Sequence, residues 1–214
     1  MNILRIVCSP RGRASESYRL SQAIVDQLIA AAPGSPAVVR DVDATALPHV
    51  DPAYAAALSA RQDPADGSQE SGALGRSFDL IQDLRDASHL VIATPMHNFT
   101  VPSSLKSWID HVVRVRHTFQ ITPQGKVGSL EDRPVYVAIS SGGDFGCGAY
   151  SQPDFLTPYL RYVLGTIGLL DVKFFSVQGT ARGDAARQEA RARAGAEIAA
   201  HSFTAGASPI FEEA

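Results

Sequence analysis

The chain has little cysteine, and this scarcity excludes two kinds of small-protein architecture. Its two cysteines, Cys8 and Cys147, are too few for a disulfide framework or a zinc cluster, so we expect no bound metal. The sequence also has no uninterrupted apolar run of membrane-spanning length. From Met1 onward it leads directly into an apolar pattern, without the charged start and cleavage site of a signal peptide. We therefore expect a protein of the reducing cytoplasm with no membrane partner.

Positive charge is not in excess either. The 19 Lys and Arg against 22 Asp and Glu leave a net charge of −3, which gives no electrostatic basis for nucleic-acid binding. Three motifs are absent as well: the Gly-x-Gly-x-x-Gly fingerprint of dinucleotide-binding folds, the Walker Gly-Lys-Ser/Thr, and the Gly-x-Ser-x-Gly elbow of serine hydrolases. The composition is otherwise ordinary, with 45% hydrophobic residues, and we expect one domain over 1–214.

Short apolar runs typical of strands alternate along the chain with stripes of apolar residues at helical spacing. This alternation predicts right-handed βαβ units and a parallel sheet. The first, third and fourth runs are the most apolar, as central strands should be, whereas the second and fifth carry charges. We therefore predict an α/β fold, a flavodoxin-like, doubly wound, five-stranded parallel sheet of order 2-1-3-4-5 with helices on both faces. The predicted strands are 3–8, 37–42, 89–93, 135–139 and 172–177.

Two segments interrupt this alternation. Residues 44–73 are rich in Ala, Asp, Pro, Gly and Ser, and a role in the core is doubtful. They are either a functional lid or interface arm, or a tolerated surface insertion. Residues 117–133 form the second excursion and contain turn signals around Gly125 and Gly128.

Ligands of such sheets bind beyond the carboxyl ends of the strands, at the point where the strand order reverses. The loop after the first strand offers three serines and an arginine just before a helix, whose N-terminus favours anions: Ser9, Arg11, Ser15 and Ser17. Ordinary capping of that helix would explain Ser15 or Ser17, but not the whole cluster. We expect a single phosphate, as in a mononucleotide.

The loops after the third and fourth strands converge on the same point. In the first of these, Pro95 and Pro102 hold backbone amides that can contact the edge of a flat heterocycle, with Met96 and Phe99 packing on its ring. In the second, Gly142 and Gly143 allow the backbone to approach a ligand closely. Three such loops together indicate a binding site.

Cys8 suggests another class of enzyme. Low-molecular-weight tyrosine phosphatases place their nucleophile at the end of the first strand, followed by an arginine after five intervening residues. Ala14 occupies that spacing here, and Arg13 falls one residue short. We therefore interpret Cys8 as a small buried hydrophobic residue.

The segments 95–99 and 105–110 together resemble the signature of the FMN-dependent NADH-azoreductases, also called FMN-dependent NADH:quinone oxidoreductases, and the resemblance extends over nearly the whole chain. It implies a flavodoxin-like fold, one FMN per subunit, and a homodimer with active sites at the interface. It also implies a ping-pong cycle in which NADH or NADPH reduces a small aromatic acceptor, a quinone or azo compound. The implied cofactor residues are Ser9, Arg11, Ser15, Ser17, Pro95, Met96, His97, Asn98, Phe99, Ser140, Ser141, Gly142 and Gly143; the implied substrate-side residues are Phe119, Ile121 and Phe145.

The chain departs from the family pattern at five positions, which are compatible with an FMN site and bear on the choice of acceptor, the nicotinamide preference or the flavin potential. His97 and Ile121 stand where tyrosines are common, Ser141 replaces a common arginine, Phe145 replaces a histidine found in some relatives, and Thr166 interrupts a usual Leu-Gly-Phe-Ile-Gly run. No side chain is required as a catalytic group, because FMN carries the chemistry, although His97 could stabilise charge. The rival hypothesis is a flavin-binding electron carrier or regulatory protein of the same fold.

Overall fold

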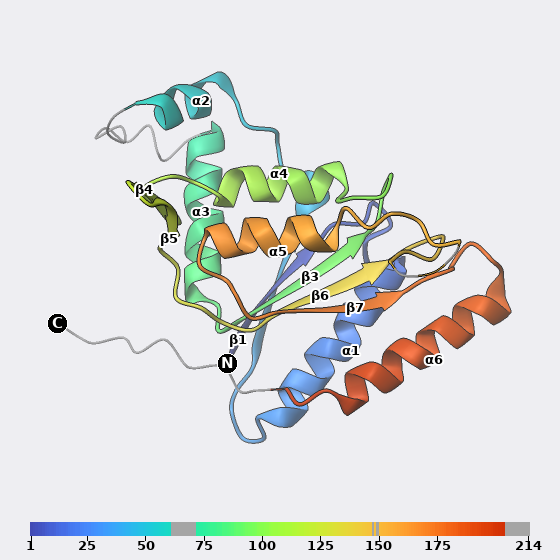
Figure 1. Ribbon diagram of the computed structural model, residues 1–214. Coiled ribbons are helices and arrows are strands. Elements are labelled where there is room, and N and C mark those ends of the chain that lie inside the picture. The colour runs from blue at the N-terminus through green and yellow to red at the C-terminus, as the bar shows by residue number, and fades with distance from the viewer. Residues whose placement is uncertain (61–71, 147, 149, 204–214) are drawn as a thin grey trace.

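The computed structural model describes residues 1–60, 72–146, 148 and 150–203, and its elements form a sheet with a layer of helices on each face (Figure 1). In chain order the elements are β1 (Asn2–Val7), η1 (Gly12–Ala14), α1 (Glu16–Ala31), β2 (Val38–Asp43), η2 (Ala44–Ala46), α2 (Pro52–Ser59), α3 (Gly72–Asp86), β3 (His89–Pro95), α4 (Ser103–Val112), β4 (Phe119–Thr122), β5 (Gly125–Gly128), β6 (Val135–Ser140), α5 (Thr157–Thr166), β7 (Val172–Val177) and α6 (Asp184–Ala200).

Five of the described strands form a parallel sheet of order β2-β1-β3-β6-β7. Ile6 at its centre lies opposite Val42 on one side and Ile92 on the other. By chain numbering the order is 2-1-3-6-7 rather than 2-1-3-4-5. The numbering differs because the excursion 117–133 contains two strands, β4 and β5, which pair with each other as an antiparallel hairpin outside this sheet.

A hydrophobic cluster covers each face of the sheet. Helices α3, α4 and α5 lie on one face, where Ile6 and Ile92 pack with the fully buried Trp108 (Figure 1). Helices α1 and α6 lie on the other, where Ile3 and Val91 join a second cluster. Successive strand residues point to opposite faces, so the central strands are apolar along most of their length, with Arg5 of β1 as a charged exception that has its own partners. Polar groups are therefore gathered at the ends of the strands.

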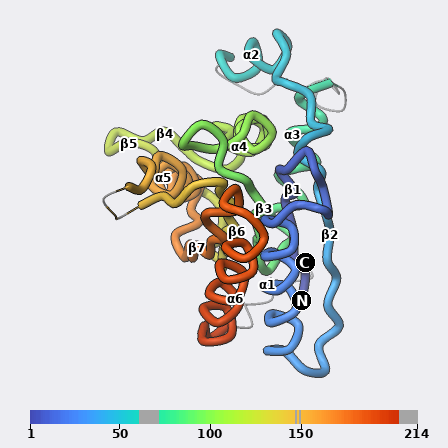
Figure 2. The backbone as a smooth tube through the Cα atoms, turned by 90° about the vertical axis from the view of Figure 1, so that its right-hand side faces the viewer, coloured from blue at the N-terminus to red at the C-terminus, as the bar shows by residue number. Residues whose placement is uncertain are grey.

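Part of the first excursion contributes to the packing, so the doubt about a core role for 44–73 is wrong for α2. Tyr54 of this helix is 2% exposed, and its hydroxyl donates a hydrogen bond of 2.7 Å to the carbonyl of Asp110 at the end of α4. Tyr54 also packs with Ala73 and Leu74 of α3. In both views α2 stands beside the end of α3, at the top of the molecule (Figures 1 and 2). Residues 61–71 of the same excursion lie outside the described residues.

Two glycines join the hairpin to the end of α5. A Cβ atom on Gly128 would lie 2.2 Å from the backbone nitrogen of Gly168, which has a φ of +104° and follows the last turn of α5. The N–H of Leu130 donates to the carbonyl of Ile167 at 3.1 Å. The hairpin is therefore positioned by backbone packing against α5, which side-chain patterns do not reveal.

A buried arginine joins the edge strand β2 to the sheet and to α1. The guanidinium of Arg5 donates two hydrogen bonds to Asp41 (2.8 and 3.0 Å), and others to Gln22 and to the hydroxyl of Tyr18. Arg5 is 4% exposed, and its Cζ lies 4.2 Å from the centre of the Tyr18 ring. Its charge is thus desolvated and depends on Asp41 as its counter-ion.

We predict that Asp41→Ala lowers the free energy of unfolding by about 3 kcal/mol, because it leaves a buried positive charge without its partner. Arg5→Met should cost about 1 kcal/mol, since it removes the charge, keeps apolar volume and leaves Asp41 at an edge where water can reach it. Urea unfolding of both variants tests this order, with Asp26→Ala as the control because Asp26 accepts an exposed hydrogen bond from Gln22. Equal losses in the two variants would contradict it.

Candidate functional site

A pocket opens at the carboxyl edge of the sheet, where β1, β3 and β6 end. The arrowheads of β3 and β6 in Figure 1 point to this edge. This is the point at which the strand order reverses, as the sequence predicts. The lining residues come from the loops after β1, β3, β6 and β7: Ser9, Pro10, Arg11, Ser15, Glu16, Pro95, Met96, His97, Ser140, Ser141, Gly142 and Thr180. Nine of the thirteen predicted cofactor residues are in this set; Ser17, Asn98, Phe99 and Gly143 are not.

The first loop presents the N-terminus of α1 to the pocket. Ser15 is the N-cap, because its Oγ accepts a hydrogen bond from the N–H of Tyr18 at 3.1 Å. Its hydroxyl lies within donating distance of the Gly12 carbonyl, at 2.8 Å. The first N–H groups of a helix have no partner within the helix, so this end can bind an anion. Ser17 is fully buried, with its Oγ 3.3 Å from that of Ser15, and it supports the cap from behind.

The second loop reverses direction in a tight turn. The N–H groups of His97 and Thr100 each donate to the other's carbonyl at 3.0 Å, and Asn98 and Phe99 between them have φ values of +48° and +70°. These are the angles of a type I′ turn, which suits Asn but strains a bulky residue such as Phe. The turn leaves Met96 in the pocket wall and His97 at its rim. His97 also borders a neighbouring hollow at the N-terminus of α4.

The two glycines of the third loop differ in purpose. A Cβ atom on Gly143 would lie 2.3 Å from Nε2 of Gln152, so packing within the protein accounts for this glycine. A Cβ on Gly142 would meet the Cβ of Ala181 at 3.5 Å, an ordinary contact and the nearest one outside its chain neighbours among the described residues. Gly142 lines the pocket, and the space that its missing side chain leaves is available to a ligand.

The loop after β7 was missed by the sequence prediction, which considered the loops after the three central strands. The N–H and the Oγ1 of Thr180 both lie 3.1 Å from the carbonyl of Ser141, and Ala181 donates to the carbonyl of Gly142 at the same distance. These bonds fold the loop back over the third loop and bring Thr180 into the pocket wall. Glu16 was also missed, although it lies between two of the predicted serines.

The predicted substrate-side residues lie outside the pocket lining. Phe119 and Ile121 are on β4, which sits at the far end of α4 and α5 from the carboxyl edge of the sheet (Figure 1). Phe119 is buried, whereas Ile121 is 71% exposed. Phe145 is half-buried and packs against the core on the side of α5. The chain's own pocket therefore does not use these side chains in its wall.

Cys8 has the environment of a structural residue. It is fully buried, its thiol faces the carbonyl of Ile6, and burial raises its pKa well above the usual range. A thiol held in its neutral form is a poor nucleophile, and the geometry therefore argues against the tyrosine-phosphatase hypothesis. Among the described residues, no group of three or more His, Cys, Asp or Glu side chains could hold a metal ion, and no helix is long and apolar enough to cross a membrane.

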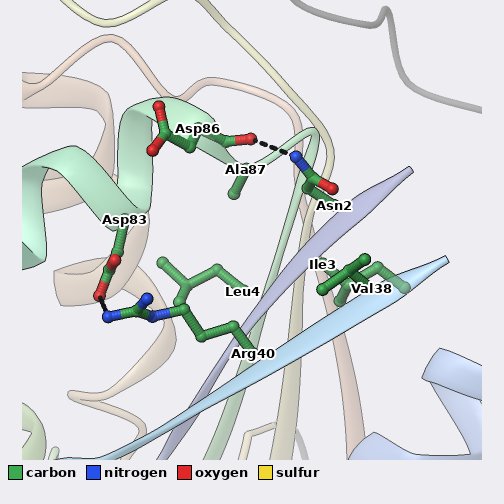
Figure 3. Close-up of a pocket in the computed structure, with 8 residues that line it drawn as sticks. All are labelled: Asn2, Ile3, Leu4, Val38, Arg40, Asp83, Asp86 and Ala87. Atoms are coloured by element: carbon green, nitrogen blue, oxygen red, sulfur yellow. Dashed lines mark hydrogen bonds and ion pairs between the residues drawn. The ribbon is translucent and has the colours of Figure 1, made fainter.

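Another pocket lies at the amino edge of the sheet, between β1, β2 and the end of α3 (Figure 3). Three of its polar side chains already bind within the protein: Arg40 pairs with Asp83 at 2.8 Å, and the amide of Asn2 donates to the backbone carbonyl of Asp86 at 3.2 Å. Burial raises the pKa of Asp83 above its usual value. This second pocket lies at the amino edge of the sheet, away from the strand-order reversal, and is therefore the weaker candidate for the functional site.

Comparison with known proteins identifies relatives along most of the chain. Residues 1–202 match the model of a family described as having a flavodoxin-like fold. The chain is 46% identical over 185 residues to FMN-dependent NADH:quinone oxidoreductase 4 of Pseudomonas fluorescens, covering 86% of this chain and 87% of the relative. It is 45% identical, again over 185 residues, to FMN-dependent NADH:quinone oxidoreductase 5 of Burkholderia lata, covering 86% and 88%.

A solved structure supports the same fold. An FMN-dependent NADH-azoreductase from Bacillus anthracis, in complex with FMN, superposes with a TM-score of 0.75 over 93% of this chain and 98% of that one. The two sequences are 24% identical, so this likeness concerns the fold.

The strain in the turn at Asn98 and Phe99 should be measurable as a difference in stability between variants. Glycine normally destabilises a protein relative to alanine, but at a φ of +70° it avoids the strain of a Cβ atom. We expect Phe99→Gly to be more stable than Phe99→Ala by about 1 kcal/mol in urea unfolding. At Thr100, outside this region of φ, the same Gly and Ala replacements should rank in the usual order. If Phe99→Ala is the more stable of its pair, the turn does not store this strain.

Proposed function

The chain belongs to the FMN-dependent NADH:quinone oxidoreductases of the flavodoxin-like fold, and we propose that it passes two electrons from NADH or NADPH, by way of bound FMN, to a quinone or an aromatic azo compound. The observation that carries the proposal is the pocket at the strand-order reversal, where a helix N-terminus, an apolar wall and an open glycine meet. In this proposal residues 1–214 act as a single FMN-binding domain.

The donors around the start of α1 fit a phosphate monoester. The N-terminus of α1 supplies N–H groups and partial positive charge, and the hydroxyls of Ser9 and Ser15 lie in the same wall. Arg11 adds a cation at the exposed rim. Ser17, which lies behind Ser15, would contribute through the cap and its backbone N–H.

The remaining walls fit a flat ring. Pro95 and Met96 provide an apolar surface, and Gly142 leaves room for the ring to approach the backbone beside Ser140 and Ser141. Gly143 supports that loop through its packing with Gln152, and Asn98 and Phe99 shape the turn that places Met96 and His97. When bound, FMN would accept two electrons and release them to the acceptor.

We propose that both substrates use the same place beside the bound flavin in turn, which is a ping-pong order. His97 stands at the rim, where an imidazole can donate a hydrogen bond to an oxygen or nitrogen of the acceptor as negative charge develops. We propose this hydrogen bond from His97 as the one catalytic contribution of a side chain. We also propose that the protein acts in the cytoplasm.

Exposed apolar side chains support a homodimer with active sites at its interface. Ile121 and Val127 of the hairpin, Tyr162 of α5 and Leu170 just beyond it are 52–79% exposed. Val127 pairs with Gln120, and Ile121 pairs with Lys126, so the side chains of Ile121 and Val127 face opposite sides of the hairpin. The proposed surface is therefore carried by Ile121, Tyr162 and Leu170. Exposed apolar side chains on neighbouring elements are typical of an interaction surface. Since β4 lies away from its own pocket, we propose that Ile121, with Phe119 behind it, faces the site of a second copy, and that Phe145 borders the substrate from within the chain.

Anaerobic mixing with NADH, and separately with NADPH, tests the activity. We expect at least one of them to bleach the absorbance of the FMN-loaded protein, and a quinone or an azo dye added afterwards to restore it. Full-chain protein prepared without flavin is the control for direct reaction between the substrates. A bound flavin that neither nucleotide bleaches would favour the electron carrier or regulatory flavoprotein.

The dimer is tested at Tyr162, which is 79% exposed on α5. Tyr162→Glu places a charge in the proposed interface, so we expect the mass in solution to shift from two chains toward one and turnover to fall about tenfold or more. Gln188→Glu adds the same charge to an exposed position of α6 and should change neither. Wild-type protein with the mass of one chain would exclude the dimer.

A further inference from the structure

Glu16 places a carboxylate in the wall of the FMN pocket, at the end where the phosphate would lie. It is the first residue of α1, and its side chain is 15% exposed. A carboxylate and a phosphate carry charge of the same sign, and repulsion between them is strong where water is partly excluded. An unpaired Glu16 would therefore oppose the binding of a phosphate monoester.

Arg191 of α6 binds both oxygens of this carboxylate. Its Nε lies 2.8 Å from Oε2 of Glu16 and its Nη2 lies 2.5 Å from Oε1, which is the geometry of a bidentate ion pair. The two residues are 175 positions apart, and the helices that carry them lie side by side in both views (Figures 1 and 2). The pair lowers the pKa of Glu16, chiefly through the hydrogen bond from Arg191, so the carboxylate is ionised at neutral pH.

Arg191 reaches Glu16 from outside the pocket. It lines a separate groove between α1 and α6, together with Glu16, Arg19 and Leu20, and Glu16 is the residue common to the groove and the FMN pocket. The neighbouring Arg187 of α6 is paired with Asp184 at 2.9 Å. Arg19 and Arg187 also attract the charge of Glu16, but Arg191 makes the largest contribution because it binds the carboxylate directly, and it does so without contributing to the pocket wall.

We propose that Arg191 is a positioning residue that makes the pocket selective for a phosphorylated flavin, FMN over riboflavin, by neutralising Glu16 and holding its carboxylate against α6. The inference rests on the proposed function, since it concerns the phosphate end of the FMN pocket. The inference predicts that Arg191 affects FMN binding by neutralising the charge of Glu16, and not by joining α1 to α6.

The test is a set of binding titrations of the full chain, prepared without flavin, with FMN and with riboflavin. We expect Arg191→Gln to weaken FMN binding about tenfold and riboflavin binding less than twofold, because only FMN carries the charge that Glu16 repels. The double variant E16Q/R191Q lacks the same ion pair but also lacks the carboxylate, and should return the ratio of the two affinities to within about twofold of wild type.

Arg193→Gln is the matched control, since Arg193 lies on the same helix and pairs with Glu189 one turn away. It should leave both affinities unchanged. If Arg191→Gln weakens FMN and riboflavin equally, or changes neither, or if the double variant remains as weak as Arg191→Gln, the inference is wrong while the proposed function stands. If the wild-type chain does not bind FMN, both are wrong.

Discussion

The hydrogen bonding of a parallel sheet is the constraint on which the rest of this structure depends. Parallel strands need crossover connections, and the helices in these connections bury both faces of the sheet. The central strands β1, β3 and β6 therefore have no face left for polar chemistry. The polar groups that line the pocket lie at the strand ends, where the loops after β1, β3, β6 and β7 meet. The location of the pocket is thus a consequence of topology before any side chain is chosen.

This dependence explains why much of the fold could be predicted from the sequence. The five runs of the sheet were identified to within one or two residues, because strands buried on both faces are the most apolar runs of the sequence, even with Arg5 inside β1, and the edge strands are less so. The helix start at Ser15 follows from local capping chemistry. The positions of the loops at the site follow from the strand order, so nine predicted residues could be brought together without knowledge of any distance.

The errors have a common physical cause, which is that they depend on contacts distant in the sequence. Helix α2 packs through Tyr54, which bonds to the carbonyl of Asp110, and through Ala57, and half of its eight residues are alanine. The hairpin β4–β5 is placed by the close approach of Gly128 and Gly168, which are 40 positions apart in the sequence. A glycine in a sequence indicates a turn, but it does not show whether another backbone segment lies against it. Thr180 enters the site because an edge strand's loop folds back on Ser141, and no local pattern marks that contact.

The turn at Asn98 and Phe99 and the braced loop at Ser141 and Gly142 have one property in common: their shapes are held by main-chain hydrogen bonds. Amide and carbonyl groups are present whatever the side chain is. A pocket assembled in this way can retain its ligand while the residues on its rim diverge. The exposed position 97 is then free to change under selection for a different acceptor, and new substrate preferences can evolve without rebuilding the cofactor site.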